Sequence, residues 1–248
     1  IDIAAWQRIK AKNKLMMRVY QFVPLRLWAR LDSFIKKNGR GDDMLRWGGV
    51  KGYADGSLGA ATAWLYRPYL DDHSTSGLMV SDTGWLRKNI LSADAAGLQI
   101  AIHAIGDKAN DFIEMYFAEA AEKNGKRDRR FRIEHAQHLS QKGISGFAQL
   151  SIIPSMQAIH LVDDGKWAAK RIDADMISRT YAFRNLLDIK ANLTLGSDWD
   201  VASLNPLEGI CATVTRQTND GKNNAGWVAA QKISVAEALR CYTANNAF

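Results

Sequence analysis

The sequence contains 248 residues with a formal net charge of +7, and 47% of the residues are hydrophobic while 24% are charged. This length and balance favour one large globular domain, and no apolar run reaches the roughly 18 residues that a membrane span needs. The basic residues form short clusters rather than a stripe, so we expect neither nucleic-acid binding nor membrane association.

Short apolar runs alternate with helical segments along the chain. Strands are predicted over 15–23, 50–54, 99–105, 131–135, 151–157 and 192–196. Helices are predicted over 1–14, 28–37, 82–96, 108–123, 141–150, 174–189, 206–218 and 234–243. Six alternations of strand and helix predict an α/β fold with a parallel sheet that is open or closed into a barrel. A complete (β/α)8 barrel needs eight strands, so we expect two strands to be missing.

The connection over 60–81 has no clear period and is unusually long. Loops of this length are commonly functional. Its aromatic and basic side chains, Trp64, Tyr66, Arg67 and Tyr69, suggest a pocket wall or lid. The alternative is that these side chains only pack the loop against the domain.

Metal-capable residues recur at the ends of the predicted strands. Lys51 and Asp55 belong to the second strand and its exit, His103 to the third, His135 to the fourth, and Asp198 follows the last. Because the carboxyl ends of parallel strands meet at one edge, these residues are expected to lie close together. Two neutral imidazoles and a carboxylate suit zinc or another divalent transition metal. Each residue taken alone has an alternative interpretation: Asp198 could cap the following turn, and His135 could be a hydrogen-bonded core residue.

Four segments resemble the amidohydrolase superfamily. They are 50–59 (VKGYADGSLG), 101–107 (AIHAIGD), 132–137 (RIEHAQ) and 195–198 (LGSD). The resemblance is greatest to the N-substituted formamide deformylase-like branch, amidohydrolase family 3, and extends over most of the chain, from about Leu15 to Ala247. It implies a TIM-type (β/α)8 barrel with a metal centre at its mouth. About six of the eight βα units are expected here, with the first two strands missing.

The resemblance also implies roles for particular residues. His103 and His135 match the histidines that bind metal, and Asp198 matches the aspartate that binds metal and moves the proton of the attacking water. Lys51 matches a lysine that is carboxylated in some members and bridges two metals. A lysine among metal ligands is reasonable only when neutral or carboxylated. The alternative is an ion pair between Lys51 and a carboxylate such as Asp55.

Substrate contacts are expected from the residues around this centre. Asp55, Gly56 and Ser57 follow the second strand and are predicted to line the pocket, together with His160. Either His135 or His160 would stabilise the developing oxyanion. For His160 a position in a surface loop is an equal alternative.

One departure from the superfamily pattern is clear. Members carry His-X-His at the end of the first barrel strand, whereas the five histidines here are His73, His103, His135, His138 and His160. We therefore interpret residues 1–248 as a partial catalytic barrel domain, an internal fragment of a longer protein that is inactive alone. The exposed strand edges of an incomplete barrel predict self-association into a homo-oligomer.

The resulting functional prediction is a metal-dependent hydrolase. It would cleave carbon–nitrogen bonds of small non-peptide amides or formamides with a metal-activated water, using one or two divalent ions, zinc by preference. The alternative is a non-catalytic regulatory or binding protein that retains the amidohydrolase fold. A cytoplasmic location is favoured, and a periplasmic one stays open.

Overall fold

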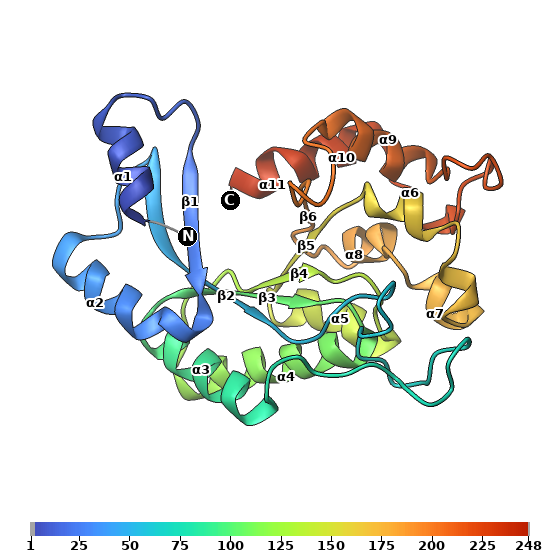
Figure 1. Cartoon of the computed structure of the whole chain (residues 1–248), viewed down its shortest axis with the longest axis horizontal. Helices are drawn as coiled ribbons and strands as arrows, with labels where there is room; N and C mark the ends of the chain where they lie inside the picture. Colours follow the sequence, from blue (N-terminus) through green and yellow to red (C-terminus); the bar gives the residue numbers. More distant parts are fainter. Residues whose placement is uncertain (1–2, 248) are drawn as a thin grey trace.

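The computed structural model describes residues 3–247, which form a curled sheet with most of its helices on the outer side (Figure 1). The strands are β1 (Val19–Pro24), β2 (Leu45–Tyr53), β3 (Gln99–Ala104), β4 (Arg132–His135), β5 (Ile153–Met156) and β6 (Thr194–Leu195). They pair in this order, and every pair is parallel. Within residues 3–247, β1 and β6 are the two edges of the sheet. The predicted α/β class is confirmed, and the architecture is that of a partial TIM-type barrel. Self-association through the two edges stays a prediction.

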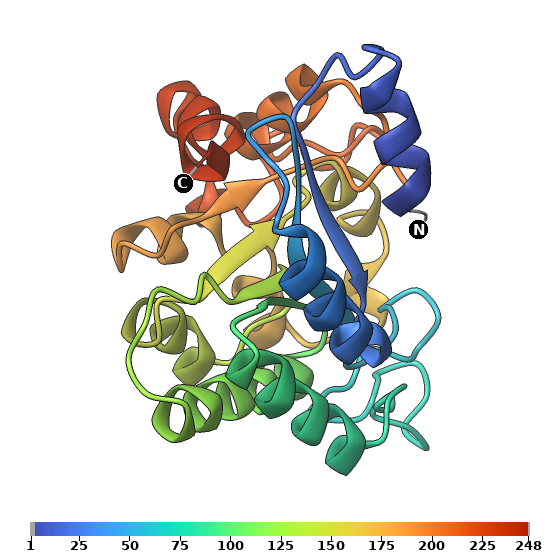
Figure 2. The ribbon, with the colours of Figure 1, turned by 90° about the vertical axis from the view of Figure 1, so that its left-hand side faces the viewer.

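Helices connect the strands and cover the sheet. They are α1 (Ile3–Ala11), α2 (Trp28–Asn38), α3 (Thr83–Ala95), α4 (Asp107–Lys123), α5 (Gln141–Gln149), α6 (His160–Asp164), α7 (Ala174–Ser178), α8 (Phe183–Asp188), α9 (Pro206–Thr215), α10 (Val235–Tyr242) and α11 (Ala244–Ala247). Short 3-10 turns lie at Leu25–Leu27, Ala168–Lys170 and Ala229–Gln231. Figure 2 shows β1 and α2 at the near edge of the sheet. Among these helices, none has both the length and the hydropathy that crossing a bilayer requires.

Side-chain caps fix where several helices begin. The carboxylate of Asp82 accepts the Trp85 N–H at the start of α3, and Asn205 accepts the Leu207 N–H at the start of α9. Such caps satisfy backbone donors that have no partner within the helix. Ser234 and Glu237 form the reciprocal capping box that their spacing predicts at the start of α10.

The observed boundaries differ from the predicted ones where the backbone turns sharply. The helix predicted over 174–189 is two helices, α7 and α8, because Tyr181 has a φ of 49° and donates its N–H to the carbonyl of Gln137. The helix predicted over 206–218 ends at Thr215, because Arg216 adopts the left-handed conformation. Tertiary contacts override the local pattern at both places.

The core lies between the sheet and its outer helices. Ile100 and Ile102 of β3 have no exposed surface, as expected of a parallel strand covered on both faces. Phe117 of α4 stacks on Phe131, just before β4, with ring centroids 4.2 Å apart. Burial of these side chains is what holds α4 against the strands that carry the candidate site.

A buried carboxyl group lies between α4 and α5. Glu114 is 8% exposed, and its Oε1 has no hydrogen-bond partner among the described residues. The Glu114 side chain packs against α5 at Gly143 and Gly146, and a Cβ at Gly146 would overlap Glu114 Oε2. Burial raises the pKa of Glu114 to about 9, and the charge of Asp111 acts in the same direction. Between about pH 4.5 and about pH 9, the folded state therefore keeps the Glu114 proton that the unfolded chain has lost.

This group should make stability depend on pH. Its contribution falls as the pH rises from about 4.5, where the unfolded chain loses the proton, to about 9, where the folded state does. In Glu114→Gln the proton is not needed, so the free energy of unfolding should fall by about 4 kcal/mol less than in the wild type between pH 5 and pH 8. Urea titrations at both pH values measure this difference. Glu122→Gln, an exposed change on the same helix, should leave the wild-type slope unchanged. Equal slopes in the wild type and Glu114→Gln would contradict the assignment.

Candidate metal centre and its pocket

A cavity of about 500 Å3 opens at the carboxyl ends of the strands. Six of the eight residues predicted for the site line it, namely Lys51, Ser57, His103, His135, His160 and Asp198. They come from β2 and the loop after it, β3, β4, the start of α6 and the loop after β6. The parallel topology thus brings together side chains that are far apart in the sequence.

Three of these residues form a group with metal-ligand geometry. His135, His160 and Asp198 each offer one ligand atom, and these atoms all lie within 4.8 Å of one another. The His160 Nε2 is 3.8 Å from Asp198 Oδ2. Two imidazoles and one carboxylate are a donor set that fits a divalent transition metal. The sequence had placed His160 only in the substrate pocket, whereas its position suits a ligand.

His103 lies next to this group but outside it. Its ring is 4.5 Å from that of His135, centroid to centroid, as expected for histidines at neighbouring strand ends. Its Nε2 is 2.9 Å from the carbonyl oxygen of Gly56. Because a carbonyl only accepts, the neutral ring carries its proton on Nε2 and keeps a lone pair on Nδ1. Its role as a ligand stays a prediction.

The protonation states suit a cation. Burial, together with the neighbouring His103, lowers the pKa of His135 to about 4. Burial also lowers the pKa of His103. The contact with His160 lowers the pKa of Asp198, which favours the carboxylate. Neutral imidazoles and an ionised carboxylate are the forms that bind metal.

The backbone is unusual at two of the three grouped residues. His135 has a φ of 74° and Asp198 a φ of 56°, both in the left-handed region that non-glycine residues seldom adopt. Such conformations cluster at functional sites, where the surrounding structure maintains them. Here they redirect the chain directly after β4 and after β6.

Lys51 lies in the cavity wall with its ammonium 4.8 Å from the centre of the Tyr53 ring. Burial lowers its pKa, while the charges of Glu134 and Asp198 act in the opposite direction. A lowered pKa increases the fraction of neutral amine, which is the form that reacts with carbon dioxide. Carboxylation of Lys51 stays a prediction.

Asp55 has a structural position rather than the predicted pocket position. It is 1% exposed, and its carboxylate accepts the backbone N–H groups of Trp64, Ile105 and Gly106. It therefore ties the loop after β2 to the turn between β3 and α4, and it is not available to pair with Lys51. Gly56 likewise lies outside the cavity wall, and a Cβ there would overlap the Thr62 side chain.

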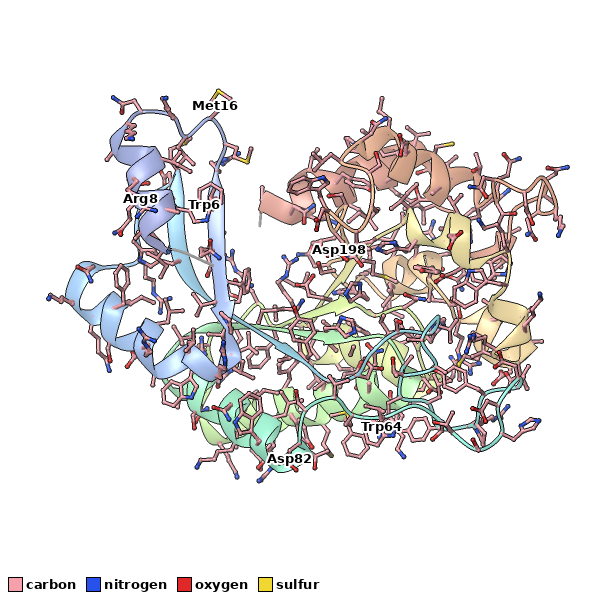
Figure 3. All side chains as sticks on the ribbon, in the orientation of Figure 1. Trp6, Arg8, Met16, Trp64, Asp82 and Asp198 are labelled. Atoms are coloured by element: carbon pink, nitrogen blue, oxygen red, sulfur yellow. The ribbon has the colours of Figure 1, made fainter. Side chains whose placement is uncertain are left out.

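The connection over 60–81 packs against α4 and is not the expected wall or lid. Trp64 contacts Phe112 with ring centroids 4.7 Å apart, and the Tyr66 hydroxyl donates to Asp111. Figure 3 shows Trp64 on the opposite side of β3 and β4 from Asp198. None of the residues 60–81 is among those that line the cavity. The aromatic side chains therefore anchor the loop.

Several wall residues were missed from the sequence. Gln137, Asp164 and Trp167 line the cavity. Asp164 and Trp167 do not lie at the end of a predicted strand, so the rule used for the other site residues could not find them. The one available signal is the spacing of four between His160 and Asp164, which places both on one face of a helix. The short helix α6 was not predicted, so this signal went unused.

Comparison with known proteins identifies the relatives of this chain. The sequence model of the amidohydrolase family matches residues 1–248. Protein LONG AFTER FAR-RED 3 of Arabidopsis thaliana is 43% identical over 235 residues, which cover 94% of this chain and 40% of that protein. The provisionally named amidohydrolase YtcJ of Bacillus subtilis (strain 168) is 30% identical over 247 residues, covering all of this chain and 46% of that protein.

Among solved structures, an uncharacterized metal-dependent hydrolase from Pyrococcus horikoshii OT3 is similar to this chain. It superposes with a TM-score of 0.88 at 30% identity, over 99% of this chain and 48% of that one. The chain thus spans less than half the length of the relatives it matches.

Proposed function

The chain belongs to the amidohydrolase family, and we propose that the full-length protein is a metal-dependent hydrolase of carbon–nitrogen bonds in small non-peptide amides or formamides. The observation that carries this proposal is the convergence of His135, His160 and Asp198 in the cavity at the strand ends. The name of the Pyrococcus relative, a metal-dependent hydrolase, supports the same reading.

In this proposal His135, His160 and Asp198 hold the metal, with His103 and Lys51 beside them. A divalent ion supplies Lewis acidity to a carbonyl group and to a water molecule. Zinc is favoured because three protein ligands of this kind, with a position left open, are typical of catalytic zinc sites. If Lys51 is carboxylated, it becomes an anion that can hold a second ion.

Asp198 moves the proton. Its carboxylate accepts a proton from the attacking water, whose oxygen bonds to the carbonyl carbon. The same carboxyl group then gives that proton to the amide nitrogen as the carbon–nitrogen bond breaks, so that a carboxylic acid and an amine leave. Its partial exposure, with the side chain 39% accessible, lets Asp198 reach a water in the cavity.

A non-catalytic regulatory or binding role is the second candidate. The relative at 43% identity has a name that refers to far-red rather than to any reaction. A protein of that kind would retain the fold and the cavity without turning over an amide.

Metal content and hydrolysis of the full-length protein separate the two candidates. We expect one or two zinc equivalents per chain after purification, measured by plasma mass spectrometry. We also expect release of formate from an N-alkylformamide that a chelator abolishes and added zinc restores. A folded protein that is free of metal and hydrolyses none of a panel of N-substituted amides would favour the regulatory role.

A further inference from the structure

Besides Asp198, the carboxylates of Asp163 and Asp164 line the cavity, and Asp164 is the one that lies one helical turn from His160. Asp164 ends α6, and residues four apart on a helix have neighbouring side chains. Both side chains line the cavity. Asp164 is therefore placed to contact the part of a substrate next to the bond that would be cleaved at the candidate metal site.

The Asp164 carboxylate is held through one of its two oxygens. The Tyr181 hydroxyl and the Gln137 amide both donate to Oδ2, each at 2.6 Å. Among the described residues, no side chain donates to Oδ1. The two fixed contacts leave Oδ1 as an acceptor for a ligand in the cavity.

A buried hydrogen-bond chain fixes the direction of the Gln137 amide. Thr180 donates its hydroxyl to the carbonyl of Met176, so it accepts from Nδ1 of the fully buried His138. His138 Nε2 then accepts from the Gln137 amide at 3.2 Å, since burial lowers the pKa of His138 to about 3 and keeps the ring neutral. Both amide hydrogens of Gln137 are thus used, one on His138 and one on Asp164. This arrangement gives Asp164 a fixed orientation before any ligand binds.

The same wall contains an aromatic ring, and among the described residues no lysine or arginine is paired with Asp164. Asp163 is paired with Lys166 at 2.5 Å, so Lys166 neutralises that carboxylate and not its neighbour. Trp167, three residues beyond Asp164 in the chain, also lines the cavity. A carboxylate oxygen and an aromatic ring in one cavity wall are a combination that recognises organic cations.

We propose that Asp164 Oδ1 forms a subsite for a cationic N–H-donating group of the substrate. The preferred substrates would be amides or formamides whose nitrogen substituent carries an ammonium or amidinium group. This inference rests on the proposed hydrolase function, which it deepens by naming a substrate class.

A matched pair of probes tests the subsite in the full-length, metal-loaded protein. N-(4-aminobutyl)formamide and N-pentylformamide have equal chain lengths and differ in one terminal ammonium. The wild type should favour the ammonium probe in kcat/KM by about 10-fold or more. In Asp164→Asn the amide can still accept from Tyr181 and Gln137 through its oxygen, but it turns an NH2 group to the cavity. The ratio of the two kcat/KM values should then fall to about 1 or below, with metal content unchanged.

Two further variants keep the result interpretable. Asp163→Asn, the matched control, should leave the ratio as in the wild type, because Asp163 is already neutralised by Lys166. Tyr181→Phe keeps the buried ring and removes one of the two donors to Oδ2, so the ratio should fall part of the way even if Asp164→Asn does not fold.

Calorimetric binding of both probes separates this inference from the proposed function. If neither probe is hydrolysed and the protein binds no metal, the hydrolase proposal fails, but tighter binding of the ammonium probe that Asp164→Asn removes would still support the subsite. Equal affinity for the two probes, an unchanged ratio in Asp164→Asn, or no measurable binding of the ammonium probe would overturn the subsite.

Discussion

Replacement of Asp198 by alanine in the full-length protein is expected to lower kcat/KM for an N-alkylformamide by at least about 1,000-fold. The side chain belongs to the group of three with His135 and His160, and it is the only carboxylate of that group. The variant therefore loses a metal ligand and the group that moves the proton. Bound zinc should fall well below the wild-type level, as measured on dialysed protein.

Asp200 provides a matched control for this change. It is an exposed aspartate two positions further along the same loop, and it is not part of the grouped residues. Asp200→Ala should keep both metal and activity within a few-fold of the wild type. An Asp198→Ala protein that binds zinc normally and retains activity within ten-fold would show that Asp198 has neither role.

Replacement of Arg216 by methionine should lower the free energy of unfolding by about 3–5 kcal/mol. Arg216 is fully buried, and its guanidinium donates to the carbonyl groups of Trp227, Tyr181 and Thr180. Burial lowers its pKa to about 9, and its described side-chain hydrogen bonds all go to carbonyl groups. Methionine fills similar space but leaves three buried carbonyl oxygens without these donors. Urea unfolding at pH 7 measures the loss.

Arg184 is the appropriate control for this variant. Its side chain is partly exposed and pairs with Glu237 and Asp188 at the surface. Arg184→Met should cost about 1 kcal/mol or less, because exposed ion pairs contribute little. A similar, small cost for Arg216→Met would mean that its three hydrogen bonds do not organise the segment that positions Tyr181.

The elements that carry a strong sequence signal were predictable. Apolar runs gave the strands, and the rule that parallel strands present their carboxyl ends at one edge predicted that His103, His135 and Asp198 would meet. The structure places His103 and His135 ring to ring and puts Asp198 with His135. Their assignment as ligands depends on the experiments above.

The features that depend on tertiary contacts were not predictable. His160 joins the group through α6, a five-residue helix too short to leave a periodic pattern. Asp55 comes directly after a strand, which is where pocket residues are expected. Its carboxylate instead accepts hydrogen bonds from three backbone N–H groups of other segments. The aromatic side chains of 60–81 have the composition of a pocket wall, and only their packing on α4 shows that they anchor the loop. Nothing local in the sequence distinguishes these cases.

Anomalous diffraction from crystals of the full-length protein, recorded on both sides of the zinc absorption edge, tests the central claim most directly. The claim predicts a peak in the anomalous difference map that appears above the edge and lies within coordination distance, about 2.0–2.2 Å, of atoms from His135, His160 and Asp198. Continuous density on the Lys51 amine would identify the carbamate in the same crystal. A map without a peak among these three side chains, from protein grown and crystallised with zinc, would contradict the account.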